Sequence, residues 1–385
     1  MTYDFDRLTV RTPADSVKWD VKPGELPMWV ADMDFDAAPE IREALQARLD
    51  RGVFGYQDVT QAWRDAYCGW WQSRHGLAMD PDGLLFATGV IPILSSCVRK
   101  LTTPAEKILL MTPVYNHFFI SIRDNGREVL SSRLLETEEG YSIDFADLEE
   151  KLADPQTALL FLCNPHNPIG RAWDRETLAR IGALCEKHHV TVIADEIHCD
   201  VTDPGVDYVP FASVDDTCAR ISVTAIAPTK AFNLAGLHTA AAYVPDPVLR
   251  HKVRVALNTG DVGAPNTFAV EAAVAAFTKG GDWLDAVRAY IKGNKDLVRS
   301  AVREKFPQLR VVPSDSTYLL WLDVRGTGMD GKAFAHSLRE RTGLFLTRGD
   351  IYGAGGEDYI RWNLAAQRSR VEDALSRLET FFGEE

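Results

Sequence analysis

Lys230 stands in surroundings unlike those of a solvated surface lysine. It lies in Ala-Pro-Thr-Lys-Ala-Phe-Asn-Leu (227–234), where most of its neighbours are small or apolar. Burial lowers the pKa of a lysine, which frees the amine to form a Schiff base with a carbonyl group. Taken by itself, a lysine of this kind is more often structural.

Two further polar side chains follow apolar runs. Asp195 closes the run 190–194, and an acid at the end of a buried strand needs a partner because an unpaired buried charge is costly. A protonated pyridine nitrogen would serve, and so would a structural arginine. Asn167 lies in Asn-Pro-His-Asn-Pro-Ile-Gly (164–170), where two prolines and a glycine make a tight turn from which Asn167 projects.

Two more segments could hold an anion and a flat ring. Residues 88–92, Thr-Gly-Val-Ile-Pro, follow an expected strand at 84–87 and lead into a helix that we expect to begin near Val90. Free N–H groups at this helix start would bind a phosphate, and Gly89 lets it approach. Tyr115 follows an expected strand at 107–112, where its ring could stack on a flat cofactor. Taken singly, an ordinary turn and core packing explain these segments better.

The apolar runs that carry these residues predict a mainly parallel α/β sheet. Those at 107–112, 158–163, 190–194, 220–226 and 239–244 include several that are apolar at consecutive positions, as in strands buried on both faces. Between the second and third lies 174–189, which has helical spacing and Asp174 as a cap. This strand–helix–strand order is the βαβ unit. Ligands of such sheets bind beyond the carboxyl ends of the strands, where all these polar residues fall.

The C-terminal part has a different pattern. Helical spacing over 283–306 is followed by an expected strand at 317–324, a helix at 332–342 and a final helix after Ser369. We therefore expect a large α/β domain over 41–281 and a smaller α+β domain built from 1–40 and 282–385. A length of 385 residues favours two domains, since single cores seldom grow so large.

Charge and hydropathy indicate which binding partners and which cellular location to expect. The formal net charge of −13 argues against a nucleic-acid partner, which would require clustered lysines and arginines. No segment approaches the roughly 20 apolar residues of a membrane span. Residues 1–11 include acids where a signal peptide has a basic start and an apolar run. We expect a cytoplasmic protein without a membrane contact.

Cysteine usage predicts reduced thiols. The six cysteines are scattered without a Cys-x-x-Cys pair, which is typical neither of a disulfide framework nor of a zinc site. The cluster of Cys163, His166, His198 and Cys199 could be imagined as metal ligands, but its spacing fits no usual pattern. We expect no metal.

Taken together, residues 164–170, 195–198 and 229–237 resemble the signature of fold-type I pyridoxal-phosphate enzymes, the class I and II aminotransferase superfamily. The likeness is greatest to the MalY/PatB branch of cystathionine β-lyase-like carbon–sulfur lyases. Trp-Val-Ala-Asp-Met-Asp-Phe (29–35), Phe-Gly-Tyr (54–56) and Tyr-Ile-Arg-Trp-Asn (359–363) fit that branch. The resemblance covers nearly the whole chain. It implies the fold-type I α/β fold with pyridoxal 5'-phosphate as cofactor.

The resemblance also implies a role for each site residue. Lys230 would bind the cofactor as a Schiff base and move protons. Asp195 would keep the pyridine nitrogen protonated, so that the ring acts as an electron sink. Tyr115 would stack on the ring, and Arg361 would clamp the substrate's α-carboxylate with its planar fork. Further contacts are implied for Asn167 with the phenolic oxygen, for Val90, Ile91 and Thr229 with the phosphate, for His198 with the cofactor, for Asp32 with the substrate, and for Tyr56 with the phosphate of the neighbouring subunit in a homodimer.

Three positions depart from many aminotransferases. His198, His238 and Ala227 stand where those enzymes have a tyrosine, an arginine and a serine, and all three agree with the lyase branch. Within that branch Thr229 replaces a serine and keeps the hydroxyl, whereas Ala231 replaces a threonine, which puts one polar contact in doubt.

The function expected from this resemblance is a carbon–sulfur β-lyase. It would cleave cystathionine or other cysteine S-conjugates to a thiol, pyruvate and ammonia. An aminotransferase on the same scaffold is the first alternative, since fold does not determine function, and dependence on a keto acid would identify it. The second is a protein of this fold whose main task is to bind a regulator, which co-purification with and without cofactor would reveal.

Overall fold

The computed structural model describes residues 3–9, 11 and 16–383. Its α-helices are α1 (Pro39–Asp50), α2 (Gln61–His75), α3 (Val90–Leu101), α4 (Asn116–Arg123), α5 (Phe145–Leu152), α6 (Arg175–Lys187), α7 (Asp216–Arg220), α8 (Pro247–Thr259), α9 (Ala269–Lys279), α10 (Gly281–Lys305), α11 (Gly331–Thr342) and α12 (Arg368–Gly383). Its strands are β1 (Leu26–Pro27), β2 (Leu84–Ala87), β3 (Lys107–Thr112), β4 (Glu128–Arg133), β5 (Leu135–Thr137), β6 (Gly140–Ser142), β7 (Thr157–Cys163), β8 (Thr191–Asp195), β9 (Ser222–Ile226), β10 (Ala240–Tyr243), β11 (Arg310–Val311), β12 (Leu319–Asp323), β13 (Leu344–Phe345), β14 (Thr347–Arg348) and β15 (Tyr359–Asn363).

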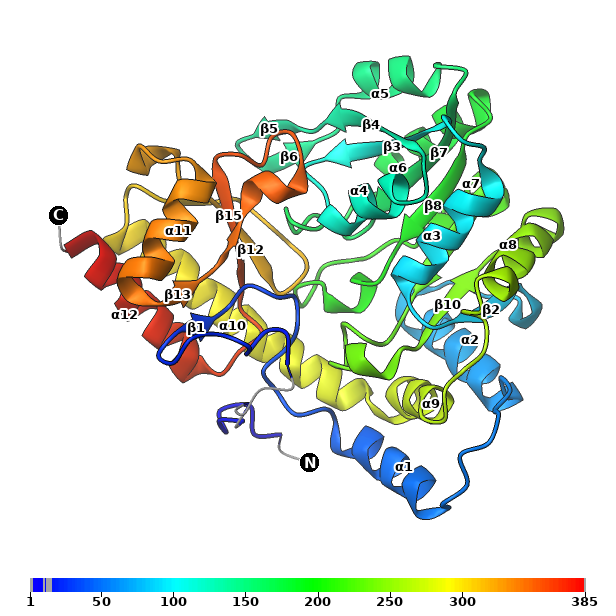
Figure 1. The fold of residues 1–385 in the computed structure, drawn as a ribbon, viewed down its shortest axis with the longest axis horizontal. Coiled ribbons are helices and arrows are strands. Elements are labelled where there is room, and N and C mark those ends of the chain that lie inside the picture. Colours follow the sequence, from blue (N-terminus) through cyan, green and yellow to red (C-terminus); the bar gives the residue numbers. More distant parts are fainter. Residues whose placement is uncertain (1–2, 10, 12–15, 384–385) are drawn as a thin grey trace.

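A seven-stranded sheet forms the centre of the right-hand part of Figure 1. Its strand order is β2-β10-β9-β8-β7-β3-β4, and its strands pair in parallel except for β10, which runs antiparallel to β2 and β9. The predicted mainly parallel α/β sheet is confirmed, and the apolar runs match strands to within about two residues.

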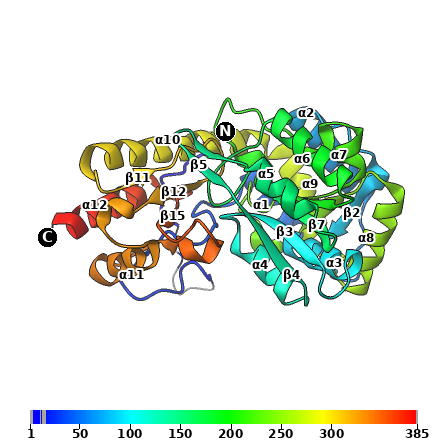
Figure 2. The same ribbon diagram turned by 90° about the horizontal axis from the view of Figure 1, so that it is seen from above.

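Helices cover both faces of this sheet (Figure 2). On β3, Ile108 and Leu110 face one way and join a core with α3, α4 and α8. Leu109 and Met111 face the other way and join a core with α5 and α6. This alternation follows from the two-residue period of a strand. Burial on both faces explains why the strands are apolar at consecutive positions.

A second, four-stranded sheet lies in the left-hand part of Figure 1, in the order β11-β12-β15-β14. Its core combines residues of α10, α11 and α12 with Leu26 and Met28 from the N-terminal segment. That segment is held by β1, which pairs in parallel with β13. Residues near both ends of the chain therefore build the same layer.

Local signals in the sequence explain where key helices begin and end. Asp174 caps α6 by accepting a hydrogen bond from the Thr177 amide, as its position predicts. Thr60 caps α2 in the same way, and the C-cap of α2 is Gly76, whose φ of 66° is readily adopted by glycine. Gly170 also has a positive φ of 67°, and a Cβ there would lie 2.8 Å from the Ser316 carbonyl oxygen. A side chain at Gly170 would thus collide with the segment that leads into β12.

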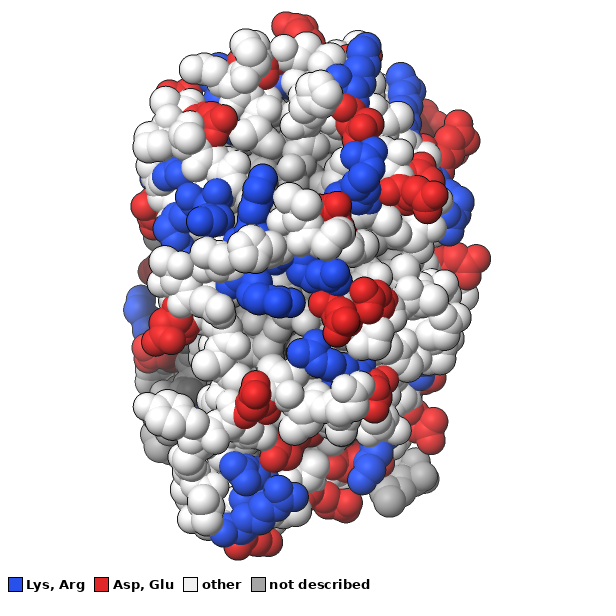
Figure 3. Space-filling model, turned by 90° about the vertical axis from the view of Figure 1, so that its right-hand side faces the viewer, with Lys and Arg blue, Asp and Glu red and all other residues white. Residues whose placement is uncertain are grey.

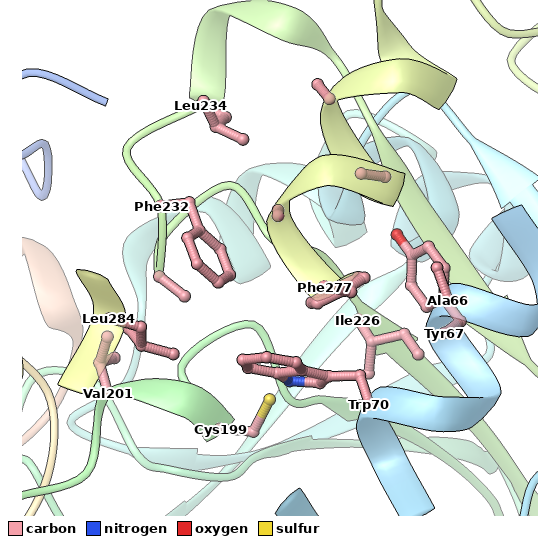
Figure 4. Packing of buried hydrophobic residues seen from close by; sticks show 14 of the residues in the cluster. Ala66, Tyr67, Trp70, Cys199, Val201, Ile226, Phe232, Leu234, Phe277 and Leu284 are labelled. Carbon is pink, nitrogen blue, oxygen red and sulfur yellow. The ribbon is translucent and has the colours of Figure 1, made fainter. Parts of the chain in front are cut away.

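An aromatic cluster fills the space between α2, α9 and the segment that follows β9 (Figure 4). The Phe277 ring lies 5.3 Å from Trp70 and 4.7 Å from Tyr67, measured between ring centroids. Phe232, two residues after Lys230, lies 5.9 Å from Trp70. Pairs of this kind stabilise beyond their buried area. They anchor the lysine segment against the helices.

The remaining bulk features agree with the composition. All six cysteines are free, and five of them are buried. On the face that Figure 3 shows, lysines and arginines stand among acidic side chains. Among the described helices, none combines the length and the hydropathy needed to cross a membrane.

Candidate active site

A cavity of about 290 Å³ opens at the carboxyl ends of the parallel strands. Eight of the predicted site residues line it: Val90, Ile91, Tyr115, Asn167, Asp195, His198, Thr229 and Lys230. They come from five separate segments of the chain. The rule that open α/β sheets bind ligands at this edge therefore located the cavity correctly.

Lys230 reaches the cavity from the loop after β9. Backbone hydrogen bonds from the Phe232 and Leu234 amides to Pro228 and Thr229 carbonyls fold this loop into tight turns. The Lys230 Nζ donates to the Ala31 carbonyl oxygen at 2.6 Å. Burial lowers the pKa of Lys230, although the nearby Asp32 carboxylate acts in the opposite direction. A lowered pKa favours the neutral, nucleophilic amine.

Asp195 is the last residue of β8 and is 4% exposed. Its Oδ1 accepts a hydrogen bond from the Ile197 amide at 3.1 Å. Burial raises the pKa of Asp195 to about 7, an effect that this hydrogen bond and the Lys230 charge oppose. A carboxylate in such a place is stabilised by a cation in the cavity, and a protonated ring nitrogen fits that need.

His198 is a neutral imidazole in the same cavity. Burial lowers the pKa of His198 to about 3, with smaller contributions from the Lys230 and Arg361 charges. Its Nδ1 is buried and lacks a hydrogen-bond partner, so one ring nitrogen is left to interact with a ligand. Tyr115 is the N-cap residue of α4, and burial raises the pKa of its phenol to about 12. Tyr115 therefore stays protonated at neutral pH.

The start of α3 provides a place for a phosphate. The helix begins at Val90, and Gly89 at its N-cap offers no side chain to bind the first amides. The first backbone bond of the helix runs from the Ile93 amide to the Gly89 carbonyl. The amides of Val90 and Ile91 therefore remain for an anion, which the helix dipole also favours.

Arg361 lies on β15, and its side chain contacts that of Asn167. Its side chain is buried, and one terminal nitrogen donates to Asn167 Oδ1 at 3.1 Å. The other donates to the Trp29 carbonyl oxygen at 2.9 Å. Its Nε is buried without a partner. A guanidinium fixed at two points with one unused donor is suited to a carboxylate.

Three predicted residues lie outside the cavity lining: Arg361, Asp32 and Tyr56. Asp32 is paired with Arg11 at 3.7 Å, and its side chain is 30% exposed. It is close enough to Lys230 to influence the pKa of the lysine. Tyr56 is fully exposed, in a segment without helix or strand. The prediction for Tyr56 concerns a neighbouring subunit, so a single chain leaves it a prediction.

Sequence reasoning overlooked Cys163 as a site residue. It is the last residue of β7 and lines the cavity, with its Sγ accepting from the Asn167 amide at 3.4 Å. Its position at a strand end was the signal that could have revealed it. His238, noted only as a departure, also lines the cavity, with a φ of 50°.

Residues 26–378 match the family described as aminotransferase class I and II. The chain belongs to this family. It is 42% identical to cystathionine beta-lyase PatB of Bacillus subtilis, over 98% of this chain and 99% of the relative. It is 32% identical to protein MalY of Escherichia coli, over 98% of both chains. The predicted family and its lyase branch are thereby confirmed.

Solved structures agree with this placement. Cystalysin from Treponema denticola, which contains pyridoxal 5'-phosphate, superposes with a TM-score of 0.96 at 32% identity over all of both chains. A C-S lyase of Staphylococcus hominis with bound pyridoxal phosphate gives a TM-score of 0.92 at 27% identity, over 99% of this chain and 98% of that one. The predicted fold is confirmed. The lysine, the buried acid and the free helix amides suit the aldehyde, ring nitrogen and phosphate of that cofactor.

Proposed function

We propose that this protein is a pyridoxal-phosphate-dependent carbon–sulfur β-lyase that cleaves cystathionine or other cysteine S-conjugates to a thiol, pyruvate and ammonia. The observation that carries the proposal is the 42% identity to a cystathionine beta-lyase across the full length of both chains. The cavity adds support, because a buried amine and a buried acid line it, and the buried Arg361 donates to Asn167 in its wall.

Pyridoxal phosphate, when bound, supplies an aldehyde that bonds to amino groups and a ring that withdraws electrons from Cα. Lys230 is the proposed base that removes the α-proton of the substrate, since burial lowers the pKa of its amine. Its hydrogen bond to the Ala31 carbonyl holds the amine at the cavity wall. A proton transfer over a short fixed distance gains from this positioning.

Arg361 orients the substrate by binding its α-carboxylate. Two of its donors are fixed by Asn167 and by the Trp29 carbonyl, which leaves little freedom in the guanidinium. A substrate held at this point presents its Cα–H bond in one direction, which would be towards Lys230. Once the proton is removed, the thiolate leaves from Cβ, and the released three-carbon enamine hydrolyses to pyruvate and ammonia.

Asp195 and His198 are proposed to tune the site. Asp195 would hold a positive charge on the ring nitrogen, which lowers the free energy of carbanion formation at Cα. His198 stays neutral because burial lowers the pKa of its imidazole to about 3. A neutral ring adds no second positive charge beside Arg361 and Lys230.

We also propose a homodimer in which Tyr56 completes the partner's phosphate site. Tyr56 and its neighbours Val53 and Phe54 expose large apolar surfaces to solvent. Exposed apolar groups gathered in one segment are typical of an interface. Twofold symmetry is the commonest arrangement among soluble homo-oligomers.

The division into domains at 41–281 and at 1–40 with 282–385 stays a proposal. It is supported by the two separate sheets and by β1, which joins the N-terminal segment to the smaller sheet. Action in the cytoplasm is likewise proposed, and the six unpaired cysteines support a reducing compartment.

The test is pyruvate release from L-cystathionine, followed with a coupled dehydrogenase. We expect turnover in the purified enzyme and none in Lys230→Ala. Lys252→Ala, which changes an exposed lysine of α8, is the matched control and should keep full activity. An enzyme that carries cofactor but releases no pyruvate from cystathionine or from S-alkyl cysteines would exclude the proposed reaction.

A further inference from the structure

We propose that His75, Cys199 and Asp200 form a binding site for Zn²⁺, separate from the cavity that holds Lys230. A ring nitrogen, a thiol sulfur and a carboxylate oxygen from these residues all lie within 4.8 Å of one another. Imidazole, thiolate and carboxylate together are the ligand types that zinc prefers in proteins.

Two elements far apart in the sequence bring these side chains together. His75 is the last residue of α2, where the chain turns at Gly76. Cys199 and Asp200 form the first part of a short 3-10 turn that follows β8 and His198. The separation of 125 residues between His75 and Asp200 explains why no motif is visible in the sequence.

The distances are compatible with a tetrahedral ion after a small adjustment. Zinc bonds of about 2.0–2.3 Å place neighbouring ligand atoms roughly 3.3–3.8 Å apart. The His75 Nε2 and Asp200 Oδ1 lie 2.8 Å apart, which is a hydrogen-bond distance, and would have to separate by about 0.5–1 Å around an ion. The widest pair, at no more than 4.8 Å, would need to close by about 1 Å. A cysteine or histidine side chain can move that far by a modest torsion.

Asp200 supplies a second observation that points to a ligand. Its side chain is 2% exposed, and its Oδ2 is buried without a hydrogen-bond partner. A buried carboxylate oxygen without a partner is costly unless a cation or a donor meets it. Its Oδ1, by contrast, accepts from the Trp70 indole at 2.9 Å and contacts His75. The carboxylate is therefore held in one orientation, as metal ligands usually are.

Figure 4 shows Cys199 beside the Trp70 indole, in the aromatic cluster. This packing restricts where the thiol can lie. A cavity of about 340 Å³ adjoins the three residues, so an ion has a route in and a water molecule has room to complete the coordination.

The charges near the site allow a divalent ion. One thiolate and one carboxylate neutralise Zn²⁺. Arg74 and Arg288 also line the cavity, but both pair with Asp285, at 2.7 and 3.3 Å. Asp207 adds a further acid to the cavity wall. Asp285 and Asp207 together match the two positive charges of the arginines.

A bound ion would tie α2 to the turn after β8. Cys199 directly follows His198, which lines the active-site cavity. Two residues beyond Asp200, Thr202 forms a bridge to Ser316 beside the smaller sheet. Zinc at this point is expected to stabilise the turn that positions His198, as a structural ion does.

The experiment measures zinc binding by the cofactor-loaded enzyme after dialysis against a chelator. Zinc is titrated in competition with a chromogenic chelator, and metal content is measured by mass spectrometry. We expect one zinc ion per chain and an upward shift of the thermal midpoint with zinc, because a ligand that binds only the folded state stabilises it. X-ray absorption at the zinc edge should show one sulfur ligand.

Three variants and two controls make the test specific. Cys199→Ser, His75→Gln and Asp200→Asn should each weaken zinc binding by at least about tenfold and abolish the thermal shift. Cys68→Ser and His251→Gln alter a thiol and an imidazole outside the cluster and should bind zinc as the parent does. Asp200→Asn keeps an acceptor for Trp70, so it should fold even if Cys199→Ser does not. The site is refuted if the parent enzyme retains no stoichiometric zinc, or if folded Asp200→Asn binds it as tightly as the parent.

Discussion

Replacing Arg361 with alanine removes the group that we propose for the substrate's α-carboxylate. Arg361 is 5% exposed, so water cannot easily replace the lost guanidinium. The parent side chain offers the unused Nε, together with a terminal nitrogen whose direction is fixed by Asn167 or by the Trp29 carbonyl. The substrate carboxylate therefore loses a bidentate, charge-assisted contact in the variant.

The size of the effect follows from that geometry. A hydrogen bond to a charged group contributes about 1.5–3 kcal/mol. Two such bonds, less the reorganisation of Asn167, give roughly 2–4 kcal/mol of lost transition-state stabilisation. At 1.36 kcal/mol for each factor of ten, kcat/KM for cystathionine should fall about 30- to 900-fold. Arg361→Lys keeps the positive charge but lacks the planar guanidinium, so its kcat/KM should lie between that of the parent and that of Arg361→Ala.

The assay is steady-state pyruvate release over a range of cystathionine concentrations. Cofactor absorbance and the thermal midpoint are recorded for each variant to verify folding. Arg348→Ala is the control, because Arg348 lies on the adjacent strand β14 with an exposed side chain. The reasoning fails if Arg361→Ala stays within about threefold of the parent in kcat/KM, or if Arg348→Ala is equally impaired.

Three further predictions concern the cofactor, the subunits and pH. Lys230→Ala should abolish the visible absorbance of the cofactor's Schiff base, and borohydride reduction of the parent followed by peptide mapping should label Lys230; a label on another lysine would refute the assignment. Mixing Tyr56→Phe subunits with Lys230→Ala subunits should yield more activity than either variant shows as a homodimer, because one site of each heterodimer then has both Lys230 and Tyr56. No gain in activity on mixing would mean that Tyr56 does not cross the interface. Burial raises the pKa of Asp195 from 3.8 to about 7, so the folded cofactor-free protein binds more protons than the unfolded chain near pH 5. The contribution of Asp195 to stability in urea unfolding should therefore be fullest below pH 4 and be lost as the pH rises towards 7. It is measured as the difference in unfolding free energy between the parent and Asp195→Asn, and a difference that does not change between pH 4 and pH 7 would contradict the burial argument.

The large sheet could be predicted because its strands are buried on both faces. A run such as that of β7 is apolar at nearly every position, which few other structures require. Strand β4 at the sheet edge has only one fully buried residue and reads Glu-Val-Leu-Ser-Ser-Arg, so its sequence carries no such signal. The antiparallel direction of β10 was also beyond prediction, because an apolar run is the same in either direction.

The grouping of eight proposed site residues in one cavity could be predicted because these residues follow strands or the loops after them. Asp195 and Lys230 lie at or just beyond strand ends, and parallel strands bring those ends to one edge. The cluster of His75, Cys199 and Asp200 depends instead on how α2 packs against the turn after β8. Contacts between elements so distant in sequence are set by tertiary packing, which local pattern cannot supply.

The most direct test of the proposed reaction is the stoichiometry of products from L-cystathionine without any added keto acid. β-Elimination predicts equal amounts of thiol, pyruvate and ammonia, formed continuously over many turnovers. L-Alanine, which lacks a leaving group at Cβ, should give no pyruvate under the same conditions. If cystathionine yields no pyruvate until a keto acid is added, and that keto acid is then aminated, the enzyme is an aminotransferase and the lyase assignment is wrong.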